Sequence, residues 1–381
     1  MKIMFFNHSF FGGGVEKALL DVVKNIDTNK HDITIFVRSK EGDLRQQYLA
    51  IEGENIHIRQ CFDYLKPGKS IFGKILNVSL IWVAEKCICR FPKIYYMIAI
   101  RDKFDIEVAY MHNEATAIIA SSTNRKSKKI AWVHTDLRQI KTWKYYFGSR
   151  RKQKKYYKKF DKIICVSKHV RNCFEELLGA YKNIEVIFNP VDSYRITELS
   201  KEETRIIKKK KTICAVGRLS YEKNFDMLIH SHLRLLQSGV DHELWIVGEG
   251  PERANLEKLI KALGVENTVT LFGFCQNPYS FIAKADIMVM SSIYEGLPVT
   301  ALETVILHKP MVSCCSVVAE VFGDYGCGII TERNEQALAE GMKKLMTNNK
   351  FYENCISETV KRSKELSLES VINQINNSLG I

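Results

Sequence analysis

The sequence lacks several features that mark common classes of protein. Its 11 cysteines include no Cys-x-x-Cys pair, which argues against a zinc site or a disulfide framework and favours reduced thiols. With only 7 prolines and 21 glycines, the chain is neither collagen-like nor of low complexity. The longest apolar run without a charge, residues 75–84, is about half of the roughly 20 residues that a membrane span needs. We therefore expect a globular protein that does not cross a bilayer.

Positive charge is concentrated in the first half of the chain. The 381 residues include 56 Lys and Arg against 43 Asp and Glu, so the net charge is +13. Residues 1–190 hold 34 basic and 19 acidic side chains, whereas residues 191–381 hold 22 and 24. We therefore expect the first half to meet an anionic partner, such as a membrane surface, a nucleic acid or a phosphorylated substrate.

Predicted strands and helices alternate along the chain in two series. The predicted strands are residues 3–6, 33–37, 106–110, 130–133, 163–166 and 184–188, followed by 213–216, 244–247, 269–272, 287–290 and 311–313. Such alternation is typical of parallel sheets covered by helices, so we predict an α/β protein with two doubly wound domains. We place the first domain at 1–192, a charged linker at 193–211, the second domain at 212–360, and at 361–381 a C-terminal helix that packs back on the first domain.

Two glycine-containing loops are candidate phosphate sites. Residues 12–17 (GGGVEK) lie between a predicted strand and a predicted helix, where glycine lets the backbone approach a ligand and the helix N-terminus attracts an anion. Residues 217–224 (GRLSYEKN) follow the first strand of the second series, where Arg218 and Lys223 can neutralise a diphosphate. Taken alone, the first segment is also compatible with a simple tight turn, and the second is equally well explained as an ordinary solvated loop.

The most specific segment is residues 294–303 (YEGLPVTALE), after the predicted strand 287–290. Gly296 permits an unusual turn, and Pro298 suits the first turn of a helix. Glu303 then lies inside that helix, where its carboxylate can accept two hydrogen bonds from a vicinal diol such as a ribose. An acidic residue near a helix start is also favoured by the helix dipole alone, so Glu303 by itself does not decide the function.

In this order and spacing, the motifs resemble those of the retaining glycosyltransferases of family 4. That family has the GT-B fold, in which two Rossmann-like domains face each other across a cleft. The resemblance implies that the first domain binds the acceptor and the second binds the nucleotide-sugar. The resemblance covers nearly the whole chain and is strongest over residues 213–328. The matching residues are Glu295 and Glu303 with seven residues between them, Arg218 and Lys223, Gly248-Glu249-Gly250-Pro251, and Gly13-Gly14-Val15-Glu16.

The resemblance implies a role for each matching residue. Arg218 and Lys223 would hold the diphosphate of a nucleotide-sugar donor, and Glu303 would bind its ribose. His134, after the strand 130–133, would contact the sugar near the reacting carbon, unless it is only a polar residue at a strand end. The expected catalytic residues are His134, Glu295, Arg218 and Lys223. The remaining donor contacts would come from Gly13, Gly14, Gly248, Gly273, Phe274, Glu295, Gly296 and Leu297.

The resemblance also implies the reaction. A hexose-type sugar would pass, with retention at the anomeric carbon, to a saccharide or polyprenyl-diphosphate-linked acceptor in polysaccharide, capsule or glycolipid synthesis. We expect UDP as the nucleotide because it is the commonest in such enzymes. The sequence has no Asp-x-Asp, which fits a site without a metal, so we expect no cofactor. Pro190 and Leu297-Pro298 depart from the family pattern, which puts one backbone contact in doubt and indicates an altered sugar pocket.

A basic and aromatic tract indicates membrane docking. Residues 141–160 contain nine Lys or Arg, seven aromatics and no acid, and residues 75–84 with Trp82 fit an interfacial helix. We expect a cytoplasmic protein, peripheral on the inner face of the cell membrane, although a solvated basic helix face explains the tract as well. The residues expected to contact membrane or acceptor are Trp82, Arg150, Arg151, Lys152, Lys154 and Lys155.

Two other functions remain open at this point. A nucleic-acid-binding protein would account for residues 141–160 but not for the Glu295 and Glu303 pair, so no nucleic acid partner is expected. A sugar-nucleotide epimerase or phosphorylase of the same fold is the second alternative, although nothing marks a lysine for the pyridoxal cofactor of a phosphorylase.

Overall fold

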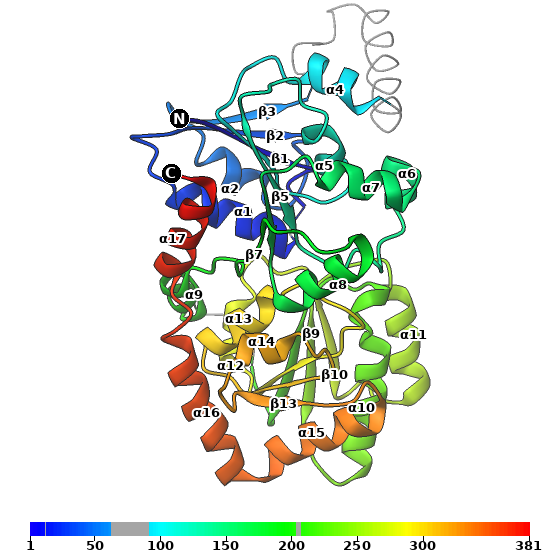
Figure 1. Ribbon diagram of the computed structural model, residues 1–381. Helices are drawn as coiled ribbons and strands as arrows, with labels where there is room; N and C mark the ends of the chain where they lie inside the picture. Colours follow the sequence, from blue (N-terminus) through cyan, green and yellow to red (C-terminus); the bar gives the residue numbers. More distant parts are fainter. Residues whose placement is uncertain (12, 62–90, 203–206) are drawn as a thin grey trace, which may run out of the picture. The chain divides into compact units, whose positions relative to one another are not determined.

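The computed structural model describes residues 1–11, 13–61, 91–202 and 207–381. The chain divides into two compact units, one formed by Met1–Pro190 with Val371–Ile381 and the other by Val191–Ser370. Each unit contains one parallel β-sheet with helices around it (Figure 1). The expected interfacial segment with Trp82 lies outside the described residues. Within the described ranges, no helix has both the length and the apolar character needed to cross a membrane.

The first unit has a seven-stranded sheet in the order β3-β2-β1-β4-β5-β6-β7. Chain order reverses between β1 and β4, which lie side by side and in parallel. Ligands of open α/β sheets bind at such a switch point, beyond the carboxyl ends of the strands. The strands are β1 (Lys2–Asn7), β2 (Asp32–Val37), β3 (Ile56–Gln60), β4 (Ile106–Ala109), β5 (Lys128–Val133), β6 (Lys162–Cys165) and β7 (Ile184–Val186).

Helices connect the strands of the first unit, and the last helix returns to it. The Lys128 ammonium group donates to the carbonyls of Ser378 (2.9 Å) and Leu379 (2.8 Å), where a cation complements a helix C-terminus. The Ser378 hydroxyl donates to Glu185 at 2.7 Å. The helices are α1 (Gly14–Asn25), α2 (Arg45–Leu49), α4 (Pro92–Ala99), α5 (Glu114–Ile119), α6 (Trp143–Phe147), α7 (Arg150–Tyr157), α8 (Lys168–Leu178) and α17 (Leu368–Leu379).

The second unit repeats this topology with six parallel strands in the order β10-β9-β8-β11-β12-β13. Its strands are β8 (Thr212–Val216), β9 (Glu243–Val247), β10 (Val269–Gly273), β11 (Ile287–Met290), β12 (Met311–Ser313) and β13 (Gly328–Ile330). Its helices are α9 (Ser193–Ser200), η1 (Tyr221–Lys223), α10 (Phe225–Gln237), α11 (Arg253–Leu263), α12 (Tyr279–Lys284), α13 (Val299–Ile306), α14 (Val318–Phe322), α15 (Glu335–Thr347) and α16 (Asn349–Ser363). Part of the segment expected as a linker thus forms α9, whose Leu199 carbonyl accepts a hydrogen bond from Asn277 at 2.8 Å.

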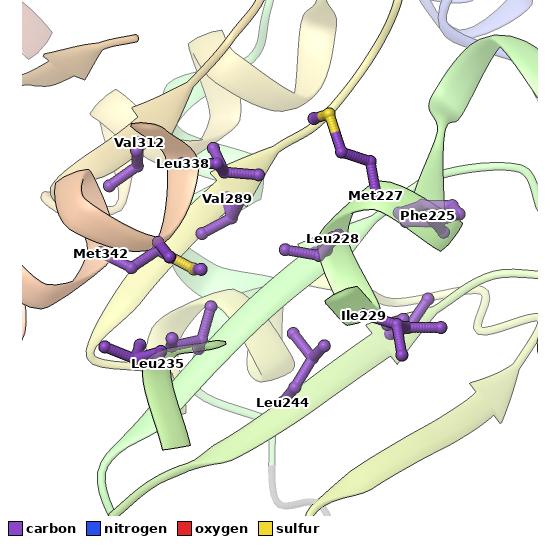
Figure 2. Packing of buried hydrophobic residues seen from close by; sticks show 14 of the residues in the cluster. Phe225, Met227, Leu228, Ile229, Leu235, Leu244, Val289, Val312, Leu338 and Met342 are labelled. Carbon is purple, nitrogen blue, oxygen red and sulfur yellow. The ribbon is translucent and has the colours of Figure 1, made fainter. Parts of the chain in front are cut away.

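The core of the second unit fixes α10 on the sheet. Leu228 and Leu235 of α10 share an apolar cluster with Val289 of β11 and with Leu338 and Met342 of α15 (Figure 2). All five are at most 3% exposed, and burying an aliphatic side chain of this size contributes about 2 kcal/mol. Because η1 leads directly into α10, this packing holds the loop that carries Lys223.

Candidate active site

Two of the predicted motifs meet at the switch point of the second sheet. β8 and β11 are parallel neighbours, while β9 and β12 lie on their outer sides. Residues 217–224 follow β8 and residues 294–298 follow β11. Since the carboxyl ends of parallel neighbours lie at the same edge, the topology brings both loops together where ligands of such sheets bind.

Lys223 and Glu295 form an ion pair across this switch point. Lys223 Nζ lies 2.5 Å from Glu295 Oε1, and the Ser292 hydroxyl donates to the same oxygen at 2.7 Å. The Ser291 hydroxyl donates to the backbone carbonyl of Lys223 at 2.7 Å. The two charged side chains are only 21% and 16% exposed. The structure therefore brings the largely buried Lys223 ammonium group and Glu295 carboxylate into contact.

Glycines allow the neighbouring loops to pack backbone against backbone. Gly248 has φ +150°, and a Cβ there would lie 1.9 Å from the Gly217 carbonyl oxygen. A Cβ on Gly250 would lie 2.2 Å from the Leu219 carbonyl oxygen. Gly273, at φ +79°, accepts a hydrogen bond from the Gly248 N–H at 2.9 Å. Loop packing alone therefore requires glycine at 248 and 250, whether or not a ligand approaches.

Glu303 is buried rather than open to solvent. It lies in the second turn of α13, is 3% exposed, and its Oε1 accepts a hydrogen bond from the Tyr279 hydroxyl at 3.1 Å. Gly296 and the buried Leu297 precede α13, whose N-cap position is Pro298. The sequence pattern predicted that a helix starts at these residues, and α13 begins there in the structure.

Two other predicted donor residues face solvent. Arg218 is exposed, and the described part of the chain records no ion pair or side-chain hydrogen bond for its guanidinium group. Phe274, just after Gly273, is 54% exposed. Both side chains are thus accessible at the edge that carries the Lys223–Glu295 pair.

The glycine motif of the first unit begins α1. Gly13 is the N-cap residue and Gly14 the first helical residue, while Gly12 is outside the described residues. A Cβ on Gly13 would lie 2.6 Å from Glu16 Oε2, so the Glu16 carboxyl group closes over the helix start. Burial raises the pKa of Glu16 to about 7.

His134 directly follows β5 and is buried among aromatic rings. Its ring is parallel to Trp132 at 6.0 Å and lies 4.7 Å from Tyr110. Burial lowers the pKa of His134 to about 3, so the imidazole is neutral at pH 7. Within the described residues neither ring nitrogen makes a hydrogen bond of normal geometry, although the Asn189 amide lies close by. The ring can therefore offer a neutral polar contact but not a charge.

The sequence did not single out the residues after β4. His112, Asn113 and Glu114 help to line a cavity of about 130 Å³ at the switch point of the first sheet. The available signal was their position, because three polar residues follow closely on the predicted strand 106–110.

One group of metal-type ligands occurs in the described residues. Asp136, His169 and Cys173 each place one ligand atom within 4.8 Å of the others. The Arg138 guanidinium group already lies among them, with Nη2 2.9 Å from Asp136 Oδ2 and 2.8 Å from Cys173 Sγ. Burial raises the pKa of Cys173 to about 11, which keeps the thiol protonated. The cluster is therefore explained by an arginine that compensates a buried carboxylate.

The predicted basic residues lie on α7 and are not equivalent. The Arg150 guanidinium group packs on the Trp143 ring at 4.1 Å and donates to Gln153 Oε1 at 2.7 Å, so it helps to hold α6 and α7 together. Lys154 is half-buried. The outward-facing members of the set are Arg151, Lys152 and Lys155.

Comparison with known proteins extends this description. A search of curated proteins finds the N-acetylgalactosamine-N,N'-diacetylbacillosaminyl-diphospho-undecaprenol 4-alpha-N-acetylgalactosaminyltransferase of Campylobacter jejuni, 31% identical over 205 residues, or 51% of this chain and 53% of that protein. The amylovoran biosynthesis glycosyltransferase AmsD of Erwinia amylovora is 25% identical over 58% of this chain and 62% of its own. This chain thus spans between about half and two thirds of the length of these relatives.

Solved structures show the same fold at low identity. Anabaena HepE in complex with UDP matches over 100% of both chains with a TM-score of 0.75 and 18% identity. TarM of S. aureus matches over 100% of both chains with a TM-score of 0.74 and 13% identity. Both units therefore have the α/β architecture of GT-B proteins.

Family models divide the chain almost where the two units meet. The model of Glycosyltransferase Family 4 matches residues 12–195, and that of Glycosyl transferases group 1 matches residues 196–362. The two matches are contiguous and include the Lys223–Glu295 pair, so the predicted family is confirmed. The chain belongs to the GT-B glycosyltransferases of the family 4 type.

Proposed function

We propose that the chain transfers a hexose-type sugar from a UDP-sugar to a hydroxyl group of a saccharide or polyprenyl-diphosphate-linked acceptor, in synthesis of a glycolipid or of a surface polysaccharide such as a capsule. The observation that carries this proposal is the ion pair between Lys223 and Glu295 at the switch point of the second sheet. The UDP complexes of HepE and the lipid-linked acceptor named for the Campylobacter relative support the choice of donor and acceptor.

The proposed chemistry follows the movement of charge. The bond between the anomeric carbon and the phosphate oxygen breaks, and its electron pair leaves with the nucleoside diphosphate. The acceptor oxygen bonds to that carbon on the same face, which retains its configuration, and the acceptor proton passes to the departing phosphate oxygen. Arg218 and Lys223 stabilise the developing negative charge, and one preorganised donor of this kind contributes about 3 kcal/mol. They supply the positive charge that a divalent ion supplies in other sites, so we propose a metal-independent reaction.

The ion pair gives Lys223 two alternative partners. Before donor binds, its ammonium group is compensated by Glu295. A diphosphate competes for that ammonium group, and Glu295 is then able to accept hydrogen bonds from sugar hydroxyls. Glu303 is held in the second turn of α13 by Tyr279, which suits the fixed contact expected for a ribose.

Nucleotide binding tests the proposal directly. Titration calorimetry with UDP, GDP and ADP should show that one nucleotide binds much more tightly than the others, and we expect it to be UDP. Arg218→Ala should weaken its binding by about 10- to 100-fold, since a charged hydrogen-bonding group is lost. Arg234→Ala is the matched control, because Arg234 pairs with Glu335 on the surface of the same unit at 2.9 Å. Equal affinities of the two variants for the nucleotide would overturn the proposed donor site.

We also propose that the first unit docks on an anionic membrane surface at the inner face of the cell membrane. Phe91, Ile94 and Met97 at α4 are 48–51% exposed and recur every three residues, which places them along one side of the helix. Burial lowers the pKa of Lys159, and the positive charges of Lys155 on α7 and Lys93 on α4 lower it further, so basic side chains lie near α4. Insertion of apolar side chains with basic residues near the headgroups is the usual mode of an interfacial helix.

Vesicle sedimentation tests the docking. Changing Arg151, Lys152 and Lys155 to Gln should release the protein from phosphatidylglycerol vesicles, since each basic residue near an anionic surface contributes about 1 kcal/mol. The control changes Lys258, Lys261 and Lys343 of the second unit to Gln, which removes the same charge from other exposed positions. If both triple variants sediment like the unmodified chain, the docking surface is wrong.

A further inference from the structure

The carboxylate of Glu303 is held by a side chain from another helix. A glutamate side chain has several rotatable bonds, so its place on α13 does not by itself fix where its oxygens point. Glu303 is 3% exposed, and its Oε1 accepts a hydrogen bond at 3.1 Å from the hydroxyl of Tyr279, which lies 24 residues earlier on α12. Tyr279 is itself only 7% exposed. A buried hydroxyl group therefore orients a buried carboxylate.

Tyr279 is in turn fixed by Asn277, just before α12. Asn277 Oδ1 accepts a hydrogen bond at 3.1 Å from the backbone N–H of Tyr279, which satisfies one of the free N–H groups at the helix start. The Asn277 amide nitrogen donates to the Leu199 carbonyl at 2.8 Å and to Glu202 Oε2 at 2.7 Å. Because both ends of the Asn277 amide are bonded, the start of α12 is tied to the end of α9.

α9 is a firm support for this connection. It packs against both α12 and α13 within the second unit (Figure 1). At its start the Asp192 side chain accepts a hydrogen bond from the Arg195 backbone N–H at 2.9 Å, and Ile196 in its first turns is buried. α9 is thus capped at one end by Asp192 and bonded at the other end to Asn277.

A carboxylate oriented in this way suits a pair of neighbouring hydroxyl groups. Its two oxygens can together accept about four hydrogen bonds, so the bond from Tyr279 leaves acceptor positions for a diol. A side chain that is already held in its binding orientation loses less conformational freedom when a ligand binds. The benefit reaches only a ligand whose hydroxyl groups bond to Glu303, and an analogue without those groups gains nothing from it.

We infer that Tyr279 is a positioning residue that sets a preference for ribonucleotides over deoxyribonucleotides. Its hydroxyl directs the Glu303 carboxylate toward the ribose, while Asn277 and α9 hold Tyr279 in place. Tyr279 acts through Glu303 and does not itself need to contact the nucleotide. The inference rests on the proposed function, in which Glu303 binds the ribose of the donor.

Titration calorimetry with UDP and with 2′,3′-dideoxy-UDP measures this preference. The unmodified chain should bind UDP about 30-fold more tightly, because the analogue lacks both hydroxyl groups. Tyr279→Phe keeps the buried ring and removes only the hydroxyl group. It should weaken UDP binding about fivefold and leave binding of the analogue unchanged, so the preference falls to about sixfold. A loss of local structure would instead weaken both nucleotides alike.

Tyr352→Phe is the matched control. The Tyr352 hydroxyl donates a hydrogen bond of the same length, 3.1 Å, to the Asp286 carbonyl just before β11, at the edge of the sheet opposite the candidate site. This variant should keep the full preference for UDP. Asn277→Ala should reduce the preference in the same direction as Tyr279→Phe, but less. In a Glu303→Gln background, Tyr279→Phe should cause no further loss.

The outcomes separate this inference from the proposed reaction. If no UDP-sugar supports transfer but the preference for UDP depends on Tyr279, the positioning role stands and the proposed function fails. If transfer occurs but Tyr279→Phe keeps the full preference, the transferase stands and the role of Tyr279 is wrong. Equal weakening of UDP and the dideoxy analogue in Tyr279→Phe also overturns the inference, since a purely structural role predicts that result.

Discussion

The two sheets share one topology but differ in chemistry at their switch points. In the second sheet a cation and a carboxylate, Lys223 and Glu295, meet over loops packed backbone against backbone through glycine. In the first sheet the corresponding place is a cavity lined by neutral acceptors such as Asn113 and His112. Topology therefore places the two candidate sites at corresponding edges of their sheets, while the residues after the strands give one site a charged pair and the other mainly uncharged acceptors.

The largest expected effect lies in the glycine loops of the second unit. Gly248→Ala would place a Cβ 1.9 Å from the Gly217 carbonyl oxygen at φ +150°, so the backbone must move. We expect a loss of about 3 kcal/mol in the free energy of unfolding, measured by urea denaturation, and loss of UDP binding.

Gly239→Ala is the control for this substitution. Gly239 also has positive φ (+84°), but nothing lies within 4 Å of its Cβ position. The Gly239→Ala variant should lose only about 1 kcal/mol of its free energy of unfolding, because alanine is strained at positive φ but meets no neighbouring atom. If the two variants are equally stable, close packing between the loops is not what requires glycine at 248.

The next effect concerns the ion pair itself. Glu295→Gln removes the charge that competes with a diphosphate for Lys223, so UDP should bind a few-fold more tightly. Turnover of the UDP-sugar should fall about 100-fold, because the carboxylate contact to the transferred sugar is lost. Calorimetry and a coupled assay for UDP release measure the two quantities.

Glu335→Gln provides the comparison for Glu295→Gln, since Glu335 also pairs with a basic side chain, Arg234, but on the surface. It should change neither UDP affinity nor turnover. Weaker UDP binding in Glu295→Gln would show that the carboxylate holds Lys223 in place for the nucleotide instead of competing with it.

Sequence patterns predicted the inner strands better than the edges. The predicted strands lie close to eleven strands of the structure, but β3 and β13 were missed. Both are edge strands, next to only one neighbour. β3 alternates apolar residues with polar ones, and β13 is a three-residue strand that begins with Gly328, so neither has the continuous apolar run of a strand buried on both sides.

Sequence patterns likewise predicted some residues of the candidate sites and missed others. Lys223 was predicted from the position of its loop after a strand, and the role of Glu295 from the resemblance to the family. The parallel-sheet rule explains why loops after neighbouring strands meet at one edge. The cavity residues His112 and Asn113 belong to no motif, and their missing hydrogen bonds depend on contacts such as that between Asn113 and Thr142, 29 residues apart. Only the folded chain shows which polar groups remain without partners.

Two pairs of histidines extend the comparison between the units. His232 and His242 in the second unit form a complete hydrogen-bonded chain, with 2.7 Å between His232 Nδ1 and His242 Nε2, 2.9 Å from His232 Nε2 to Thr268 Oγ1 and 2.8 Å from His242 Nδ1 to the Val240 carbonyl. In the first unit His112 and His134 have ring nitrogens without hydrogen bonds inside the described residues. The satisfied pair lies before β9, at the sheet edge opposite the candidate site, and we infer that its role is structural.

The smallest expected effect is the pH dependence of that structural pair. Burial lowers the pKa of His232 to about 3 and also lowers that of His242, whereas histidine in the unfolded chain titrates near 6.5. The unfolded chain therefore binds more protons in acid, so this contribution to stability is complete above about pH 6.5 and is lost as the pH falls below it. For His232 the loss of stability between pH 7 and pH 5 should be about 2 kcal/mol, measured by urea denaturation with circular dichroism.

The variant His242→Gln tests this assignment. Its amide can accept a hydrogen bond from His232 and donate one to the Val240 carbonyl, so the variant removes one titrating group and should reduce the loss of stability in acid. An equal loss in that variant would mean that acid sensitivity comes from other groups, among them the unsatisfied pair of the first unit.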